Sequence, residues 1–260
     1  MIFNNIFDTH AHYDDDSFQD DISETMDFVF SNGVSTVINC GCTVRSSIAS
    51  IELSNKYPGK VYAAVGIHPL DAAEEGIDSL TEIRKLSEDP SCVAIGEIGL
   101  DYHYDSTPID LQNHFFEKQL ILANSVGLPV IIHDREAHAD CLKHILKHRP
   151  IGVMHCYSGS LETAKQLIDA GLYIGIGGSV TFKNAVKPKQ VAKEIPLERL
   201  LLETDCPYMA PVPFRGKRNN SAYISYVAET IAELRDIEPQ TVIDIASENA
   251  RRLFLTRKGD

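Results

Sequence analysis

Residues 92–134 read CVAIGEIGLDYHYDSTPIDLQNHFFEKQLILANSVGLPVIIHD, and this stretch decides the fold. Its two ends, 92–101 and 128–134, are near-continuous apolar runs, which is typical of parallel strands covered on both faces. Between them, a segment of helical length has Pro108 near its start and Gly127 just past its end. Proline and glycine favour these helix boundaries. The stretch therefore predicts two parallel strands joined by a crossover helix.

The same alternation continues in both directions along the chain. A second clear helix is SLETAKQLIDAG (160–171), with Ser160 as its N-cap and Gly171 as its stop. The centres of the strand segments lie about 20 to 35 residues apart, the length of a strand plus a crossover helix. The other six strand segments are 6–12, 35–41, 61–69, 151–159, 172–178 and 200–207.

Eight such units predict an α/β fold of the (β/α)8 type, a TIM barrel. An open, doubly wound sheet is the alternative. No linker, charge block or low-complexity tract divides the chain, so we expect a single domain over residues 1–260.

The composition is that of an ordinary globular protein. The chain has 260 residues, 43% of them hydrophobic, and a formal net charge of -13. This argues against disorder and coiled coil. The excess of acid also argues against a tight, non-specific DNA-binding protein, because phosphate binding requires Lys and Arg. It does not exclude an enzyme whose positive charge is local, for example on a bound metal ion.

Cysteine usage and the N-terminal segment bear on location. Six cysteines form no CxxC pair and mostly lie in apolar runs, which favours a reducing, cytoplasmic compartment. No signal peptide is evident, no apolar run approaches the length of a membrane span, and no obligate protein partner is indicated.

Acidic and imidazole side chains collect at the predicted ends of the strands. In such barrels the catalytic groups come from the C-terminal ends of strands. His10 and His12 are two residues apart, so both leave one face of a strand, where two imidazoles can hold one ion. The other residues at strand ends are His68, Glu97, His133, His155, Glu203 and Asp205.

Mixed imidazole and carboxylate ligands suit Zn, Mn or Mg, and the chain has no four-cysteine cluster of the structural zinc type. Alternation should turn Cys156 and Cys206 to the opposite face, as small buried residues. The remaining histidines are expected in solvated loops and helices: His103, His114, His138, His144 and His148.

The motifs DTHAH (8–12), GIHP (66–69), GEIGLDY (96–102), HDRE (133–136), MHCYSG (154–159) and LLLETDCP (200–207) occur in this order. Together they resemble the TatD family of metal-dependent deoxyribonucleases, in the amidohydrolase-like superfamily, over essentially the whole chain. The resemblance implies two divalent metal ions. It assigns His10, His12 and Asp205 to one ion, His133 and His155 to the other, and Glu97 to both. A glutamate bridge, where many barrel hydrolases use a carboxylated lysine, favours the TatD type over the phosphotriesterase type.

Further roles follow from the chemistry of such a centre. Asp205 is the candidate to accept a proton from the nucleophilic water. His68 would contact a substrate phosphate or assist the leaving group, with packing as the alternative. Glu203 would orient a ligand, with a structural ion pair as the alternative. Asp8 and Asp101 would accept hydrogen bonds from imidazole N–H groups, or serve as turn residues.

The loop after the last strand carries the densest basic patch of the chain. Arg215, Lys217 and Arg218 are candidates to bind backbone phosphates, with a solvated loop as the alternative. Relatives commonly continue this segment with Glu-Pro, where this chain has Asn220 and Ser221. Aromatic residues near the same rim are candidates to stack on a splayed base or simply to cap the barrel: Tyr102, Tyr157 and Phe214.

These observations favour a metal-dependent hydrolase of DNA phosphodiester bonds that acts on single strands or free ends. The 3′ to 5′ exonuclease direction is implied only by the resemblance. One alternative is a lactone, amide or small phosphoester hydrolase on the same centre, because such barrels change substrate by changing loops. The other is a non-enzymatic metal-binding scaffold.

Overall fold

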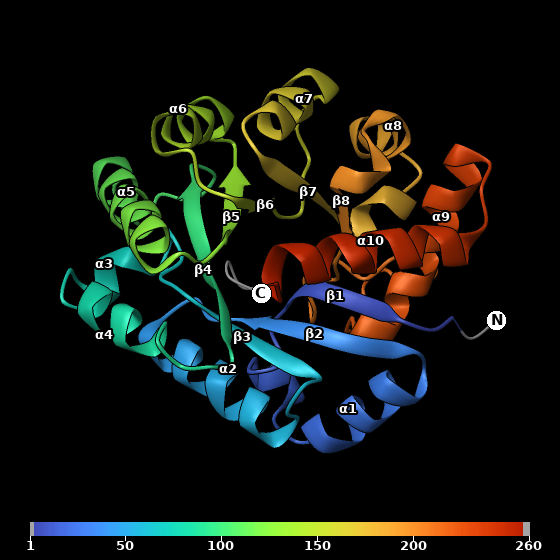
Figure 1. The fold of residues 1–260 in the computed structure, drawn as a ribbon, viewed down its shortest axis with the longest axis horizontal. Coiled ribbons are helices and arrows are strands. Elements are labelled where there is room, and N and C mark those ends of the chain that lie inside the picture. Colours follow the sequence, from blue (N-terminus) through green and yellow to red (C-terminus); the bar gives the residue numbers. More distant parts are fainter. Residues whose placement is uncertain (1–2, 257–260) are drawn as a thin grey trace.

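Eight parallel strands form one sheet, in the computed structural model, which describes residues 3–256. Every strand pairs with the next one in the chain, in the order β1 to β8. Figure 1 shows the helices arranged around the strands. The strands are β1 (Ile6–Ala11), β2 (Val34–Cys40), β3 (Val61–Val65), β4 (Cys92–Asp101), β5 (Val130–Arg135), β6 (Gly152–Met154), β7 (Leu172–Ile176) and β8 (Leu200–Leu202).

Helices follow the strands as the barrel prediction requires. The α-helices are α1 (Ile22–Ser31), α2 (Val44–Lys56), α3 (Ala72–Glu75), α4 (Ser79–Leu86), α5 (Ile109–Val126), α6 (His138–His148), α7 (Leu161–Asp169), α8 (Val186–Glu194), α9 (Ile224–Arg235) and α10 (Pro239–Phe254). Short 3-10 helices are η1 (Asp16–Phe18), η2 (Gly178–Thr181), η3 (Leu197–Arg199) and η4 (Ser221–Tyr223). The single-domain (β/α)8 barrel is confirmed, and the open sheet is excluded. Among residues 3–256, no helix has the length and apolar character needed to cross a membrane.

Local sequence signals explain the helix ends. Gly127 caps α5 in the left-handed conformation, with φ 72°. The Ser160 side chain accepts a hydrogen bond from the backbone N–H of Thr163 at the start of α7. Both features match the boundaries expected from glycine and serine at these positions.

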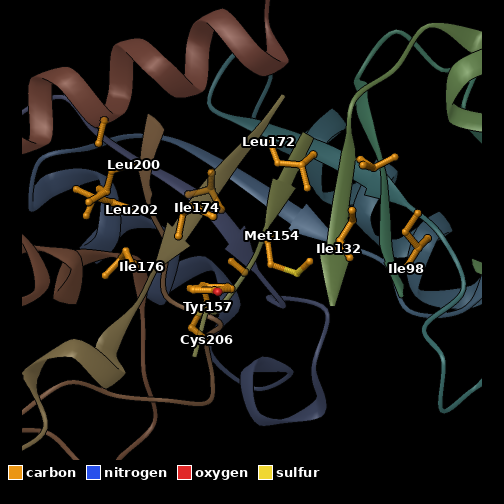
Figure 2. Packing of buried hydrophobic residues seen from close by; sticks show 14 of the residues in the cluster. Ile98, Ile132, Met154, Tyr157, Leu172, Ile174, Ile176, Leu200, Leu202 and Cys206 are labelled. Carbon is orange, nitrogen blue, oxygen red and sulfur yellow. The ribbon is translucent and has the colours of Figure 1, made fainter. Parts of the chain in front are cut away.

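The core has two layers, because side chains alternate along each strand. Leu172, Ile174 and Ile176 of β7, labelled in Figure 2, belong to the larger outer cluster, which also contains residues of the surrounding helices. Tyr173, between them in the sequence, belongs to a separate inner cluster that also contains Phe7. Residues of α10, including Phe254, complete this inner cluster. The last helix therefore contributes to the packing inside the barrel.

Three strands are shorter than the sequence predicts by four residues or more. The expected segments 61–69, 151–159 and 200–207 form strands only at Val61–Val65, Gly152–Met154 and Leu200–Leu202. Two residues beyond these strands have positive φ values, Cys156 at 44° and Asp205 at 60°, which a strand does not allow. The candidate groups His68, His155 and Asp205 therefore lie on the loops that leave the strands.

The barrel closes where β1 meets the segment after β8. We call this contact, between β1 and residues 204–206 and 221, the seam. Ala11 forms a bridge with Cys206, and the Asp205 N–H donates to the His10 carbonyl at 2.9 Å. Side chains add to this closure. Buried Asp8 accepts hydrogen bonds from the Thr204 N–H (3.0 Å), the Thr204 hydroxyl (2.6 Å) and the Ser221 hydroxyl (2.6 Å). Polar side chains therefore supplement a short backbone ladder.

Candidate metal centre

A cavity of about 800 Å³ opens at the C-terminal ends of the strands. His12, His68, His133 and His155 line it together with Glu97 and Asp205, and His10 lies buried against them. These residues come from β1, β4 and β5 or from the loops that follow β1, β3, β6 and β8. The structure therefore brings all six expected metal ligands to one place, with His68 beside them.

One oxygen of Glu97 faces the first group of ligands. Glu97 Oε2 lies 3.3 Å from His10 Nε2 and 3.5 Å from His12 Nε2. Asp205 Oδ1 lies 3.7 Å and 3.5 Å from the same two nitrogens. The ligand atoms of His10, His12 and Asp205 all fall within 4.8 Å of one another. Two nitrogens and two carboxylate oxygens thus converge, a donor set that suits a divalent cation.

The other oxygen of Glu97 faces the second group. Glu97 Oε1 lies 2.9 Å from His133 Nδ1 and 2.8 Å from His155 Nε2. Glu97 is 3% exposed, so solvent screens these contacts poorly. The two oxygens of Glu97 therefore face two different imidazole groups.

The acids and imidazoles at the centre shift one another's pKa values. Hydrogen bonds to Asp101 and Glu97 raise the pKa of His133 to about 9 despite its burial, so a cation bound there would displace a proton. Burial opposes ionisation of Glu97, but the adjacent His155 and His10 hold its pKa well below the usual value. Burial lowers the pKa of His10 to about 4. An ionised carboxylate and a neutral imidazole are the forms that bind metal ions.

Hydrogen bonds distinguish a ligand histidine from His68. His12 Nδ1 lies 2.9 Å from the Cys40 carbonyl, so in neutral His12 this nitrogen carries the proton and Nε2 keeps its lone pair. In His68 the assignment is reversed, because Nδ1 accepts a hydrogen bond from the Leu70 N–H at 3.2 Å. The Nε2 of neutral His68 therefore carries a proton, and it lies 3.8 Å from Glu97 Oε1. His68 is built as a hydrogen-bond donor to the cavity.

Two acids lie behind the candidate ligands, and one of them, Asp101, forms a hydrogen bond to a ligand ring. Asp101 Oδ2 lies 3.0 Å from His133 Nε2, which fixes the orientation of that ring. Buried Glu203 accepts a hydrogen bond from the Cys156 N–H, and its Oε1 lies 3.8 Å from His155 Nδ1. Glycine makes room for it, because a Cβ at Gly175 would lie 2.4 Å from Glu203 Oε2.

Asp8 does not take the imidazole-binding position predicted for it. Its carboxylate instead accepts hydrogen bonds from the His10 backbone N–H at 3.2 Å and from Thr204 and Ser221. The reason is its position at the seam, where it joins β1 to the segment after β8. Its contribution to the site is to hold the backbone of His10.

The predicted phosphate-binding loop lies apart from the cavity lining. The Arg215 guanidinium stacks 4.4 Å from the centre of the Phe182 ring. Arg218 donates a hydrogen bond to Asp21 at 2.8 Å, and Lys217 is exposed. Among the described residues that line the cavity, none of the three basic residues appears. Their role in binding phosphate stays a prediction.

The three aromatic residues predicted near the rim are held by the protein itself. Tyr157 is 4% exposed, and its hydroxyl donates to the Ser160 carbonyl at 2.8 Å, so its ring is covered. Tyr102 donates a hydrogen bond to Asp140, and Phe214 stacks on Tyr223 with ring centres 4.2 Å apart. The histidines expected outside the site lie in α5, α6 and the loop after β4: His103, His114, His138, His144 and His148.

Sequence reasoning missed several cavity residues on the loops. Cys42 Sγ lies 3.8 Å from Glu97 Oε2, and Arg135 and Tyr104 also line the cavity. Cys42 follows β2 and Arg135 ends β5. The expectation that functional groups lie at the C-terminal ends of strands could therefore have identified both. The interpretation of Cys156 was wrong, because it lines the cavity. Strand alternation does not govern it, since its φ is 44° and β6 ends earlier.

The likeness of this chain to known proteins agrees with the geometry. The family described as TatD related DNase matches residues 7–255. The chain is 44% identical over 253 residues to an uncharacterized metal-dependent hydrolase, YabD, of Bacillus subtilis, with 96% of this chain and 98% of YabD covered. It is 32% identical over 257 residues to the 3'-5' ssDNA/RNA exonuclease TatD of a Rahnella species, with 96% and 98% covered.

A solved structure agrees as well. The crystal structure of YJJV, a TatD homolog from Escherichia coli, superposes with a TM-score of 0.92 at 32% identity, covering 98% of this chain and 100% of that one. Sequence, fold and relatives point the same way, and the relatives' descriptions include metal-dependent hydrolysis. The chain is a metal-dependent hydrolase and belongs to the TatD related DNase family.

Proposed function

We propose that the protein is a nuclease that hydrolyses DNA phosphodiester bonds with two divalent ions, removing nucleotides in the 3′ to 5′ direction. One observation carries the proposal, namely that the two oxygens of Glu97 face separate imidazole groups at 2.8–3.5 Å. The name of the Rahnella relative, which specifies single-stranded DNA and RNA, supports the substrate class. We also expect a cytoplasmic location, since the six cysteines are unpaired.

The residues that would hold the ions divide between the two groups. His10, His12 and Asp205 would hold one ion, His133 and His155 the other, and Glu97 both. Ions bound there supply Lewis-acid activation of water and neutralise charge on the phosphate. The ligands fit Mg, Mn and Zn.

The chain's own residues would handle the protons. Asp205 would accept the proton of the attacking water on a carboxylate oxygen, because nearby imidazoles hold its pKa below the usual value despite burial, so the group is ionised. His68 would donate a hydrogen bond from Nε2 to a phosphate or leaving oxygen. Glu203 would keep the His155 ring in its orientation.

The depth of the centre supports action on single strands or free ends. His10 is fully buried, so a scissile phosphate must enter the cavity to reach the ligands. A base-paired duplex must first unpair to do so, whereas a strand end need not.

Digestion of end-labelled DNA tests the proposal. Protein stripped of metal with EDTA should be inactive on single strands and recover when Mg, Mn or Zn is added. Glu97→Gln should remain inactive with every metal. Full activity in chelator would contradict the proposal, and so would a stripped and reloaded protein that cleaves lactones or amides but no phosphodiester.

A further inference from the structure

The cavity has an unusual balance of fixed charge. Six carboxylates line it, from Asp14, Asp15, Glu97, Asp101, Asp134 and Asp205. Among the described lining residues, Arg135 is the one side chain with a permanent positive charge. The positive charge of two divalent ions would not offset the negative charge of six ionised carboxylates. An anionic strand that enters the cavity therefore needs a further cationic contact.

The position of Arg135 allows it to supply this cationic contact. It is the last residue of β5, two residues after His133, and strand alternation places both side chains on the same side of the sheet. Across the ladder it is paired with Asp101, the partner of the His133 ring. Arg135 therefore stands next to the second ion site, at the rim of the cavity.

The guanidinium of Arg135 is held in place but keeps its donors available. It lies 4.9 Å from the centre of the Tyr104 ring, a cation–π contact that limits its motion. Within residues 3–256, its N–H groups have no ion pair or hydrogen bond to another side chain. Arg218, by contrast, is engaged by Asp21 at 2.8 Å.

We propose that Arg135, supported by Tyr104, anchors the phosphate next to the scissile phosphate of a bound strand. The inference rests on the proposed nuclease function and narrows its substrate class. The planar guanidinium presents parallel N–H donors that match two phosphate oxygens, and the stacked ring lowers the entropy lost when they bind. Arg135 thus acts in substrate positioning, apart from the reacting atoms.

The proposal specifies which substrates benefit. A polynucleotide has a second phosphate that Arg135 can bind while the first lies at the ions. A diester with a single phosphate, such as bis(4-nitrophenyl) phosphate, has none. Loss of the arginine should therefore lower kcat/KM on a polynucleotide and leave kcat/KM on a single-phosphate diester unchanged.

The test compares Arg135→Ala and Arg135→Lys with the parent on a single-stranded oligonucleotide and on bis(4-nitrophenyl) phosphate. For Arg135→Ala we expect kcat/KM on the oligonucleotide to fall about 10- to 100-fold, mostly through KM, as for a lost hydrogen bond to a charged group. Its kcat/KM on the single-phosphate diester should stay within about twofold of the parent, because no contact is lost. The salt dependence of oligonucleotide binding should weaken by about 0.7 in log–log slope.

Arg135→Lys should recover part of the affinity and most of the salt slope, because it restores the charge without the planar fork. Arg199→Ala is the matched control, since Arg199 also stacks on a tyrosine, 5.0 Å from the Tyr173 ring, but lies before β8 at the opposite end of the barrel. It should leave both activities unchanged.

The outcomes separate this inference from the proposed function. If the parent cleaves the oligonucleotide and Arg135→Ala cleaves it equally well, the anchor alone is refuted. Equal losses on both substrates would also refute it, because they would mean a catalytic or structural role. A metal-loaded parent that cleaves neither substrate would overturn the nuclease proposal and the anchor with it.

Discussion

Replacing Ser221 with alanine should destabilise the protein markedly, because its hydroxyl is the centre of the seam. The Ser221 hydroxyl donates to Asp8 Oδ2 at 2.6 Å and lies 2.7 Å from the Tyr13 hydroxyl. The Ser221 N–H donates to the same tyrosine oxygen at 2.9 Å. Since the serine proton goes to Asp8, the Tyr13 O–H must donate to Ser221 Oγ. The serine hydroxyl thus satisfies two buried groups at once.

The expected cost follows from these two contacts. Loss of a hydrogen bond to a charged acceptor is worth about 1.5–3 kcal/mol, and a buried hydroxyl left without an acceptor costs about 1–3 kcal/mol. Asp8 keeps its bonds from Thr204 and the His10 N–H, so the two losses do not add in full. We expect Ser221→Ala to lower the free energy of unfolding by about 2–4 kcal/mol.

Urea denaturation followed by circular dichroism measures this change. The control is Ser225→Ala, four residues on, whose hydroxyl donates to the Ala222 carbonyl within a partly exposed helical turn. It should change stability by no more than about 0.5 kcal/mol. If Ser221→Ala cost no more than this control at an unchanged m-value, the seam would not depend on the serine and the reasoning would be wrong.

Three further predictions concern the metal centre. Manganese at 100 times its dissociation constant should stabilise the parent by about 2.7 kcal/mol per site in calorimetry, and Glu97→Ala should abolish most of the gain; equal stabilisation of both would contradict the bridging role. Asp101→Asn should weaken metal binding about 10- to 100-fold in a chelator competition, and unchanged affinity would show that the His133 ring needs no support. Gly175→Ala should destabilise the apo protein by about 1–3 kcal/mol in urea, since the added Cβ would meet Glu203, while an unchanged midpoint would mean that the carboxylate moves aside freely.

Much of the fold could be predicted because its causes are local. The segment at 92–101 is an apolar run and forms β4 over the same residues. Pro108 and Gly127 mark the two ends of α5 because one cannot donate a backbone hydrogen bond and the other accepts a positive φ. Since parallel strands end at the same edge, the six candidate ligands could be expected at one mouth from the sequence.

What the sequence did not indicate depends on loops and on hydrogen-bond direction. The alternation of side chains ends with the strand, so it wrongly placed Cys156 on the face away from the cavity. Cys42 and Arg135, at or just beyond strand ends, were not considered. Whether a histidine offers a lone pair or a proton depends on a backbone partner distant in sequence, such as the Cys40 carbonyl for His12. Asp8 and Ser221 are joined across most of the chain, and no periodic pattern reports such a contact.

The seam also bears on the order in which the barrel assembles. Its hydrogen bonds join residues 196 positions apart, as between Asp8 and Thr204, while neighbouring strands elsewhere are separated by a single crossover. Closing so long a loop carries a large entropic cost before any contact forms, so we expect the seam to form late, after the neighbouring strands have paired. Variants at the seam should therefore speed unfolding in chevron experiments and leave the refolding arm nearly unchanged. The last contacts to form would then set how long the native state survives.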